Sequence, residues 1–260
     1  MAADLPDTLR LEMQDDVAVL RLARPEKRNA LDDATVRGLG RFFDEPPAAA
    51  RAVVLHGEGA HFSAGLDLST LTERNEQEGI VHSRLWHRAF ERIEFGALPV
   101  IAMLHGAVVG GGLELAASVH IRVAERSAYY ALPEGSRGIY VGGGGSVRLA
   151  RLVGVARMMD MMLTGRTYGA EEGVALGFSQ YLTEPGEGLA RAIALAHRAA
   201  ENAALTNFAI IQALPRIAQA APETGLLMES LMSAIAQGSD EAKARLADFL
   251  EKRAAKVTHG

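Results

Sequence analysis

The chain has 260 residues, of which 48% are hydrophobic and 23% are charged, as in ordinary globular proteins. A formal net charge of −5 argues against nucleic acid as the main partner, although local fields still allow an anionic ligand. The lack of cysteine excludes disulfides, thiolate metal ligands and a cysteine nucleophile. The N-terminal residues show no signal-peptide pattern, and no apolar run reaches about 18 residues. We therefore expect a cytoplasmic protein without a membrane partner.

The first half of the chain alternates between β-type and helical patterns. The expected strands cover residues 9–14, 17–23, 50–59, 99–106, 119–124 and 128–132, and the expected helices cover 32–43, 76–95 and a segment from residue 113. Because strands alternate with helices, the pattern indicates parallel βαβ units in a layered α/β domain.

From about residue 143 onward the pattern is mainly helical. Ser239 precedes a run of acidic residues and is a good N-cap for the last helix, since acidic side chains favour the positive end of a helix. Glu241 and Arg245 are spaced four residues apart on this helix and are expected to pair. No repeat or low-complexity linker interrupts the chain.

Two glutamates lie beside glycine-rich turns. Glu114 follows the glycine run at 110–112, and Glu134 precedes a loop with glycines at 142–145. Two carboxylates can handle one water molecule or one carbon-bound proton, and N–H groups of glycine turns can hold a carbonyl oxygen that gains negative charge. The apolar neighbours of Glu114 also predict a buried carboxyl with a raised pKa. Each glutamate alone could be an ordinary acid, but the pair favours enolate chemistry.

A third glycine-rich turn lies in VVLHGEGAHFSAGLDL at 53–68. Its backbone donors could face a ligand without obstruction from side chains, although on its own a plain tight loop is the better interpretation. Other templates fail: the chain has no GxxxxGK[ST] phosphate loop, no GxSxG nucleophile turn and no HExxH or HxxxH pair. We therefore expect no metal site, and we expect His105 to pack in the core.

In order along the chain, these segments resemble the crotonase (enoyl-CoA hydratase/isomerase) superfamily. The matching segments are RPEKRNAL at 24–31, HFSAGLDL at 61–68, GAVVGGGLELA at 106–116 and LPEGSRGIYVGGGGSVRLARLVG at 132–154. The resemblance covers nearly the whole chain. It implies an α/β fold in which a spiral core of ββα repeats, with the acyl-CoA site, spans residues 1–195. A helical region over 196–260 would serve trimerisation or act as a lid.

The same resemblance implies roles for ten residues as acids, oxyanion-hole donors and substrate contacts. Glu114 and Glu134 match both acids of the hydratases, the backbone N–H groups of Leu66 and Gly111 match the oxyanion hole, and Lys27, Arg28, Ala64, Asp67, Leu68 and Gly142 match positions along CoA or near the water. Coenzyme A is part of the substrate, so no separate cofactor is implied. The implied partners are an acyl-CoA thioester and identical subunits, in a homotrimer or a dimer of trimers.

Two features depart from the family's usual pattern. Val141 replaces the usual proline, and Gly143 adds a fourth consecutive glycine, which predicts a reshaped or more mobile loop. Tyr129, Tyr130 and Tyr140 are expected to place aromatic bulk near Glu134, where it would narrow the pocket or favour a particular acyl group.

An enoyl-CoA hydratase is the leading functional interpretation. An isomerase that moves a double bond from C3 to C2 is the nearest alternative, because one carboxylate that shuttles a proton would suffice. A CoA-thioester hydrolase or lyase ranks lower, and a non-catalytic acyl-CoA-binding protein ranks lower still because both acids are present. RNA binding would need a basic helix, whereas the helix at 76–95 carries glutamates and arginines in similar numbers.

Overall fold

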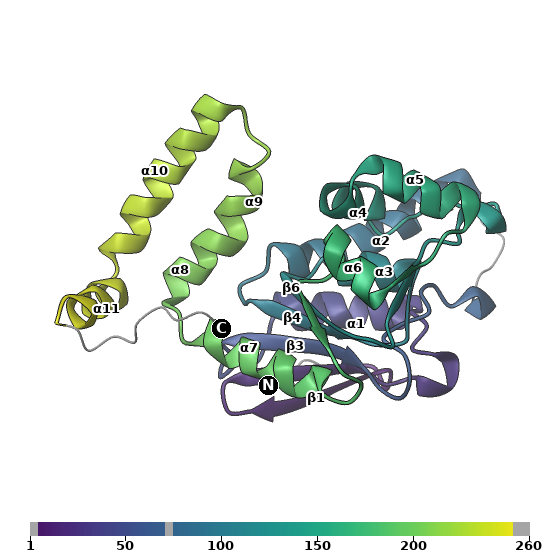
Figure 1. The fold of residues 1–260 in the computed structure, drawn as a ribbon, viewed down its shortest axis with the longest axis horizontal. Coiled ribbons are helices and arrows are strands. Elements are labelled where there is room, and N and C mark those ends of the chain that lie inside the picture. The colour runs from purple at the N-terminus through teal and green to yellow at the C-terminus, as the bar shows by residue number, and fades with distance from the viewer. Residues whose placement is uncertain (1–4, 71–74, 252–260) are drawn as a thin grey trace. The chain divides into compact units, whose positions relative to one another are not determined.

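The structure is a computed structural model that describes residues 5–70 and 75–251 (Figure 1). Contacts along the chain group into two compact units, residues 1–199 and residues 200–260. Each unit is described by itself. The predicted functional division at residues 195 and 196 remains a prediction, and its C-terminal part extends beyond residue 251, outside the described residues.

The first unit is built on two sheets. The larger sheet has the strand order β1 (Leu9–Gln14), β2 (Val17–Leu22), β3 (Ala52–Gly57), β4 (Val100–Leu104), β6 (Ile121–Glu125) and β9 (Tyr181–Thr183). The smaller sheet has the order β5 (Ala107–Val109), β7 (Tyr129–Ala131) and β8 (Tyr168–Gly169). In the larger sheet β1 and β2 are antiparallel, whereas every later neighbour pair is parallel. The alternating pattern of the sequence therefore predicted the α/β class correctly.

Seven α-helices and three short 3₁₀ turns complete the described part of this unit. The helices are α1 (Asp33–Asp44), α2 (Glu76–Glu94), α3 (Gly111–Ala116), α4 (Gly145–Val153), α5 (Val155–Thr164), α6 (Ala170–Leu176) and α7 (Gly188–Ala200). The turns are η1 (Pro25–Lys27), η2 (Leu68–Thr70) and η3 (Gly135–Arg137). Figure 1 shows α4 and α5 next to each other, as expected for helices separated only by Gly154.

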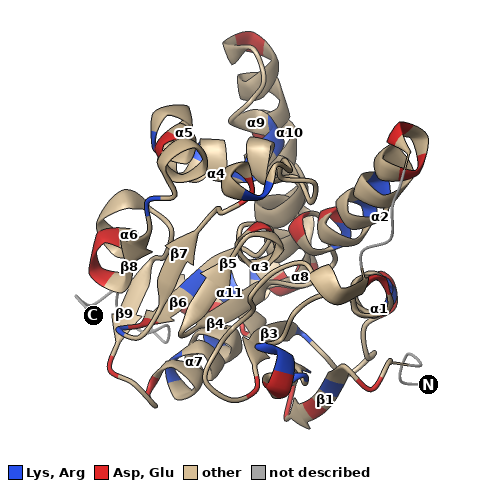
Figure 2. Ribbon diagram, turned by 90° about the vertical axis from the view of Figure 1, so that its right-hand side faces the viewer, with Lys and Arg blue, Asp and Glu red and all other residues tan. Residues whose placement is uncertain are grey.

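Burial explains why these residues form this arrangement. Every residue of β3 and β4 is buried, as expected for central parallel strands that are covered on both faces. Helix α1 begins at an Asp32 cap whose carboxylate accepts the Thr35 N–H, and α2 begins with a capping box of Asn75 and Glu78. Figure 2 shows the acidic start of α2, followed by arginines along the same helix.

The expected strands and helices up to residue 132 are confirmed to within a few residues, but three strands were missed. The missed strands are β5, β8 and β9, which have three, two and three residues. Strands this short contain too little alternation to be recognised, and two of them lie in the part that was expected to be mainly helical.

The second unit consists of helices within the described residues. They are α8 (Ala204–Phe208), the π-helical turn η4 (Ala209–Ala213), α9 (Leu214–Ile217), α10 (Pro222–Gly238) and α11 (Asp240–Leu250). The Ser239 hydroxyl accepts the Ala242 N–H at 3.2 Å, and Arg245 pairs with Glu241 at 3.1 Å, so the predicted cap and ion pair of α11 are confirmed. Among the described residues, no helix combines the length and apolar character needed to cross a bilayer.

Candidate active site

A cavity of about 370 Å³ in the first unit brings together seven of the ten predicted site residues. Its lining comes from the turn after β3, from α2, from the turn before α3, and from the chain between β7 and α4. The seven residues are Ala64, Leu66, Leu68, Gly111, Glu114, Glu134 and Gly142. The remaining three, Lys27, Arg28 and Asp67, do not line this cavity.

The backbone N–H groups of Leu66 and Gly111 are adjacent and available. The Gly65 carbonyl accepts the Leu31 N–H, and the Asp67 N–H donates to the Leu31 carbonyl. Because the backbone alternates in direction along an extended segment, the N–H of Leu66 points away from Leu31. Gly111 is the first residue of α3, where a helix leaves its N–H groups without intrahelical partners. Neither group donates a backbone hydrogen bond within residues 5–70 and 75–251. A Cβ placed on Gly111 would lie 3.4 Å from the Leu66 nitrogen, so the two residues lie close together on the wall of the cavity.

Glu114 has a buried carboxylate that is held by the glycine loop. Its side chain extends from the first turn of α3, and the residue is only 3% exposed. The oxygen Oε1 accepts the N–H groups of Gly143 and Gly145 at 2.8 Å each. Burial raises the pKa of Glu114, and these hydrogen bonds oppose the rise because they favour the charged form. The predicted buried acid with a raised pKa is confirmed.

Glu134 has a buried carboxyl with one oxygen left free. Its Oε2 has no hydrogen-bond partner within the described part of the chain. A Cβ placed on Gly110 would lie 2.7 Å from Oε1 of Glu134, so this carboxyl lies against the glycine turn that precedes α3. Burial, together with the charge of Glu114, raises the pKa of Glu134 to about 7. A carboxyl of this kind can hold or release a proton near neutral pH.

Aromatic side chains shape the cavity differently from expectation. Trp86 of α2 lines it, and a Cβ placed on Gly111 would lie 2.7 Å from its ring. Tyr140 also lines the cavity. Tyr130, however, is fully buried, stacks on Phe178 at 4.8 Å and contacts the Ser179 hydroxyl at 2.5 Å. The expectation that Tyr130 narrows the pocket was wrong, because the alternation of β7 directs this ring into the core.

Lys27, Arg28 and Asp67 belong to the turns beside the cavity. The Asp67 carboxylate is 4% exposed, pairs with Arg24 at 2.9 Å and accepts the Ser69 hydroxyl at 2.6 Å. The Ser69 hydrogen bonds and the positive charges of Arg24 and Lys27 lower the pKa of Asp67. Lys27 donates to the Ser69 hydroxyl at 2.7 Å. The Asp67 carboxylate is therefore used inside the turn, and the CoA contacts of these residues stay predictions.

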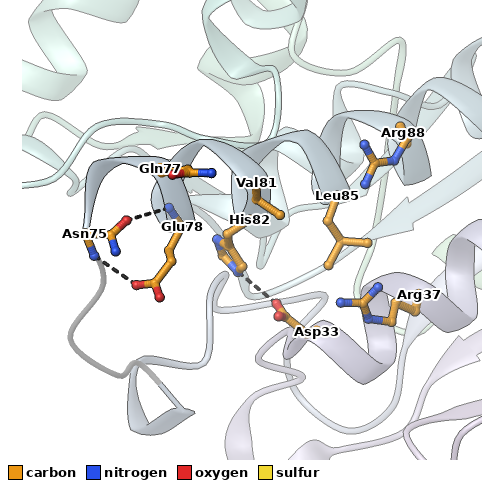
Figure 3. Close-up of a pocket in the computed structure, with 9 residues that line it drawn as sticks. All are labelled: Asp33, Arg37, Asn75, Gln77, Glu78, Val81, His82, Leu85 and Arg88. Carbon is orange, nitrogen blue, oxygen red and sulfur yellow. Dashed lines mark hydrogen bonds and ion pairs between the residues drawn. The ribbon is translucent and has the colours of Figure 1, made fainter.

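A second hollow of about 510 Å³ lies between α1 and α2 (Figure 3). His82 lines both this hollow and the cavity of the two acids. Its Nε2 lies 2.8 Å from Oδ1 of Asp33, while Arg37 and Arg88 lie near Leu85 farther along the groove. The wall of this second hollow therefore carries both acidic and basic side chains.

Sequence reasoning missed the contribution of α2 to the site. Ser83 and Trp86 line the cavity together with His82, but the helical pattern alone does not tell which face of a helix meets which loop. His105 is buried and its Nε2 lies 2.9 Å from the Gly59 carbonyl, so the prediction of a core histidine is confirmed. Within the described segments, no group of three side chains could hold a metal ion.

Comparison with known proteins identifies the family of this site. The sequence pattern of the enoyl-CoA hydratase/isomerase family matches residues 12–259. The chain belongs to this family. A short-chain-enoyl-CoA hydratase of Clostridium acetobutylicum is 33% identical over 246 residues, which cover 94% of each chain. A Bacillus subtilis protein, named provisionally as an enoyl-CoA hydratase, is 35% identical over 252 residues, which cover 95% of this chain and 97% of the relative.

A solved structure extends the comparison to three dimensions. A Rhodopseudomonas palustris protein, assigned provisionally as an enoyl-CoA hydratase, superposes with a TM-score of 0.93 and is 60% identical. The match covers 98% of this chain and all of the other. The predicted crotonase superfamily and the α/β fold with a C-terminal helical region are therefore confirmed, and the chain is an enzyme of that superfamily.

Proposed function

We propose that this enzyme is an enoyl-CoA hydratase that adds water across the C2=C3 bond of a 2-enoyl-CoA thioester. One observation carries the proposal: two buried carboxyls from different elements line a single cavity that also contains two available backbone N–H groups. Hydration needs such a set, because a water must be activated, a carbon protonated and an oxyanion stabilised in the same step.

The proposed mechanism gives each carboxyl a different part. Glu114 accepts two backbone N–H groups, which favour its charged form, and it acts as the base that removes a proton from the water attacking C3. The pKa of Glu134 is raised to about 7, so its carboxyl is mostly protonated below that pH. It delivers this proton to C2. The atoms balance, since the water gives its proton to Glu114 and its hydroxyl to C3 while C2 takes the proton of Glu134. Proton exchange with solvent then returns Glu114 to its charged form and Glu134 to its protonated form.

The proposed oxyanion hole works on the thioester carbonyl. The N–H groups of Leu66 and Gly111 bind its oxygen and stabilise the negative charge that develops as the hydroxyl adds. Removing one such donor typically raises the barrier by about 3–4 kcal/mol. Gly142 lines the same cavity, and its N–H is proposed to help hold the attacking water.

The alternatives use only part of this site. An isomerase needs a single proton carrier, which Glu134 with its free Oε2 could supply, and it leaves Glu114 without a task. A hydrolase, a lyase or a non-catalytic acyl-CoA-binding protein leaves the arrangement of both acids unexplained. The second carboxylate, held by two N–H donors, is the observation that favours hydration.

The proposed partners follow from the same reaction. The substrate is an acyl-CoA thioester, and CoA enters as part of it, so the proposal includes no separate cofactor. The turn with Lys27 and Arg28 lies beside Ala64, because the Arg28 carbonyl accepts the Ala64 N–H at 2.9 Å. We propose that Lys27 and Arg28 bind the CoA portion. A homotrimer or a dimer of trimers in the cytoplasm remains part of the proposal.

The test is an assay of purified enzyme with crotonyl-CoA and, separately, with a 3-enoyl-CoA. Absorbance reports the loss of the conjugated double bond, and mass spectrometry reports the product. We expect crotonyl-CoA to gain the mass of one water. A product of unchanged mass with a conjugated spectrum, obtained only from the 3-enoyl substrate, would show an isomerase instead.

A further inference from the structure

The loop that holds Glu114 consists of the four consecutive glycines at 142–145. A run of glycines has little conformational preference of its own, so contacts with other segments must fix its conformation. The loop nevertheless presents two N–H groups to the same carboxylate oxygen. Two side chains of α2 connect to this loop, Ser83 directly and Glu94 through Arg148.

The first tie is a hydrogen bond from Ser83 of α2. Its hydroxyl donates to the Gly142 carbonyl at 2.7 Å. That carbonyl and the N–H of Gly143 are the two ends of one trans peptide unit, which is planar, so fixing one end orients the other. The Gly143 N–H donates to Oε1 of Glu114 at 2.8 Å. A continuous chain therefore runs from the Ser83 hydroxyl through one peptide to the proposed base.

The second tie holds the next peptide of the loop. Arg148 donates to the Gly143 carbonyl at 3.0 Å and pairs with Glu94, also on α2, at 2.6 Å. His87, four residues after Ser83 on α2, also contacts this serine: its Nε2 lies 3.3 Å from the Ser83 oxygen. Because the hydroxyl hydrogen of Ser83 is engaged with the loop, its oxygen is free to accept a hydrogen from His87.

We propose that Ser83 is a positioning residue for hydration: through the peptide between Gly142 and Gly143 it orients the carboxylate of Glu114 toward the attacking water. Linked hydrogen bonds also polarise one another, so the Ser83 donor strengthens the N–H that holds the carboxylate. This inference rests on the proposed hydratase activity. It gives α2 a task in the reaction that the glycine and glutamate motifs do not contain.

The experiment compares wild-type enzyme with Ser83→Ala, Ser83→Thr and Ser230→Ala. Ser230 is the matched control, since it is a helical serine whose hydroxyl donates to a backbone carbonyl, that of Leu226, at 2.9 Å. For each protein, kcat and KM are measured with crotonyl-CoA, and the Kd of butanoyl-CoA is measured by calorimetry. The saturated thioester needs the cavity and the oxyanion hole but no water, so its affinity reports whether the pocket is intact. Melting temperatures are recorded alongside.

We expect Ser83→Ala to lower kcat about ten-fold, with KM and the butanoyl-CoA Kd within about two-fold of wild type, because a misplaced reacting group lowers the rate more than binding. Ser83→Thr keeps the hydroxyl and should recover most of the loss, while Ser230→Ala should match wild type. A wild-type kcat in Ser83→Ala would overturn the inference. A parallel loss of kcat, butanoyl-CoA affinity and melting temperature would overturn it too, since it would mean a general structural role. Failure of the proposed function is distinguishable, because wild type itself would not hydrate crotonyl-CoA.

Discussion

At the scale of single residues, the two acids differ because their surroundings differ. Both are buried, which penalises a charged carboxylate. Glu114 receives two N–H donors that compensate its charge, whereas Oε2 of Glu134 has no partner among the described residues. This difference in surroundings supports the proposed roles of Glu114 as base and Glu134 as acid.

Replacing Glu134 by glutamine should lower kcat for hydration by about 10²–10⁴-fold, because the proton donor to C2 is lost. In the proposed mechanism Glu134 must be protonated, so the rate should fall as the pH rises through its pKa of about 7. The pH profile of kcat/KM measures this limb. The matched change Glu229→Gln, on an exposed helical position, should leave the rate and the profile unaltered. A profile that stays flat from pH 6 to about 9 would contradict the assignment.

The same carboxyl should make stability depend on pH. Folding raises the pKa of Glu134 from 4.5 to about 7, so between these values the folded state binds the proton more tightly than the unfolded state. The free energy of unfolding therefore falls as the pH rises from about 4.5 to 7, by up to about 3 kcal/mol. Glu134→Gln has no carboxylate charge to bury, so this variant should be more stable than wild type at pH 8 but not at pH 5. Urea unfolding at both pH values tests the crossover.

Among the elements, the proposed oxyanion hole depends on the close approach of two turns. The turn after β3 and the start of α3 meet where a Cβ placed on Gly65 would lie 2.6 Å from the Val109 carbonyl and 2.9 Å from the Gly111 nitrogen. Asp67 holds the first turn through Arg24 and Ser69, and the start of α3 supplies the second donor. The geometry of the hole is thus set by packing between elements.

Gly65→Ala should separate the two donors. The new Cβ meets backbone atoms, and φ of +88° is also unfavourable for alanine. We expect kcat/KM to fall at least about 10²-fold, as for loss of an oxyanion donor. Gly165→Ala is the control, because its φ is +77° but no atom lies within 4 Å of its Cβ. The control should cost about 1–2 kcal/mol of stability and keep its activity. Equal activity in both variants would contradict this account of the hole.

At the scale of the whole molecule, the second unit has apolar side chains that its own helices leave exposed. Leu227, Leu231 and Ile235 of α10 are 61%, 55% and 48% exposed and are spaced four residues apart. Exposed apolar patches of this kind usually mark a contact with another protein. The proposed homotrimer would give this face a partner.

Leu231→Asp should therefore weaken self-association. Light scattering is expected to give a trimer or hexamer for wild type and a smaller species for Leu231→Asp, because a charge in an apolar contact is unfavourable. Ser230→Ala lies on the same helix and should assemble like wild type. A monomeric wild-type protein would contradict the proposed assembly.

The α/β class, the family and the seven predicted residues that line the cavity were predictable from the amino-acid sequence. These features depend on contiguous signals: alternating apolar patterns, glycine runs and the acids beside them. Local backbone rules connect such signals to strands, turns and helix starts. For this reason the caps of the last helix and the burial of Glu114 were also predictable.

The contact of α2 with the glycine loop and the directions of the aromatic rings depend on long-range packing and were not predictable. Ser83 and Gly142 are 59 positions apart, and Asp67 and Arg24 are 43 apart, so no local pattern links either pair. Tyr130 was expected in the pocket and lies in the core. The periodicity of a sequence shows that a helix or strand has an apolar face. Which other element packs against that face depends on long-range contacts. The residues that orient the chemistry therefore emerged only when the folded chain brought distant segments together.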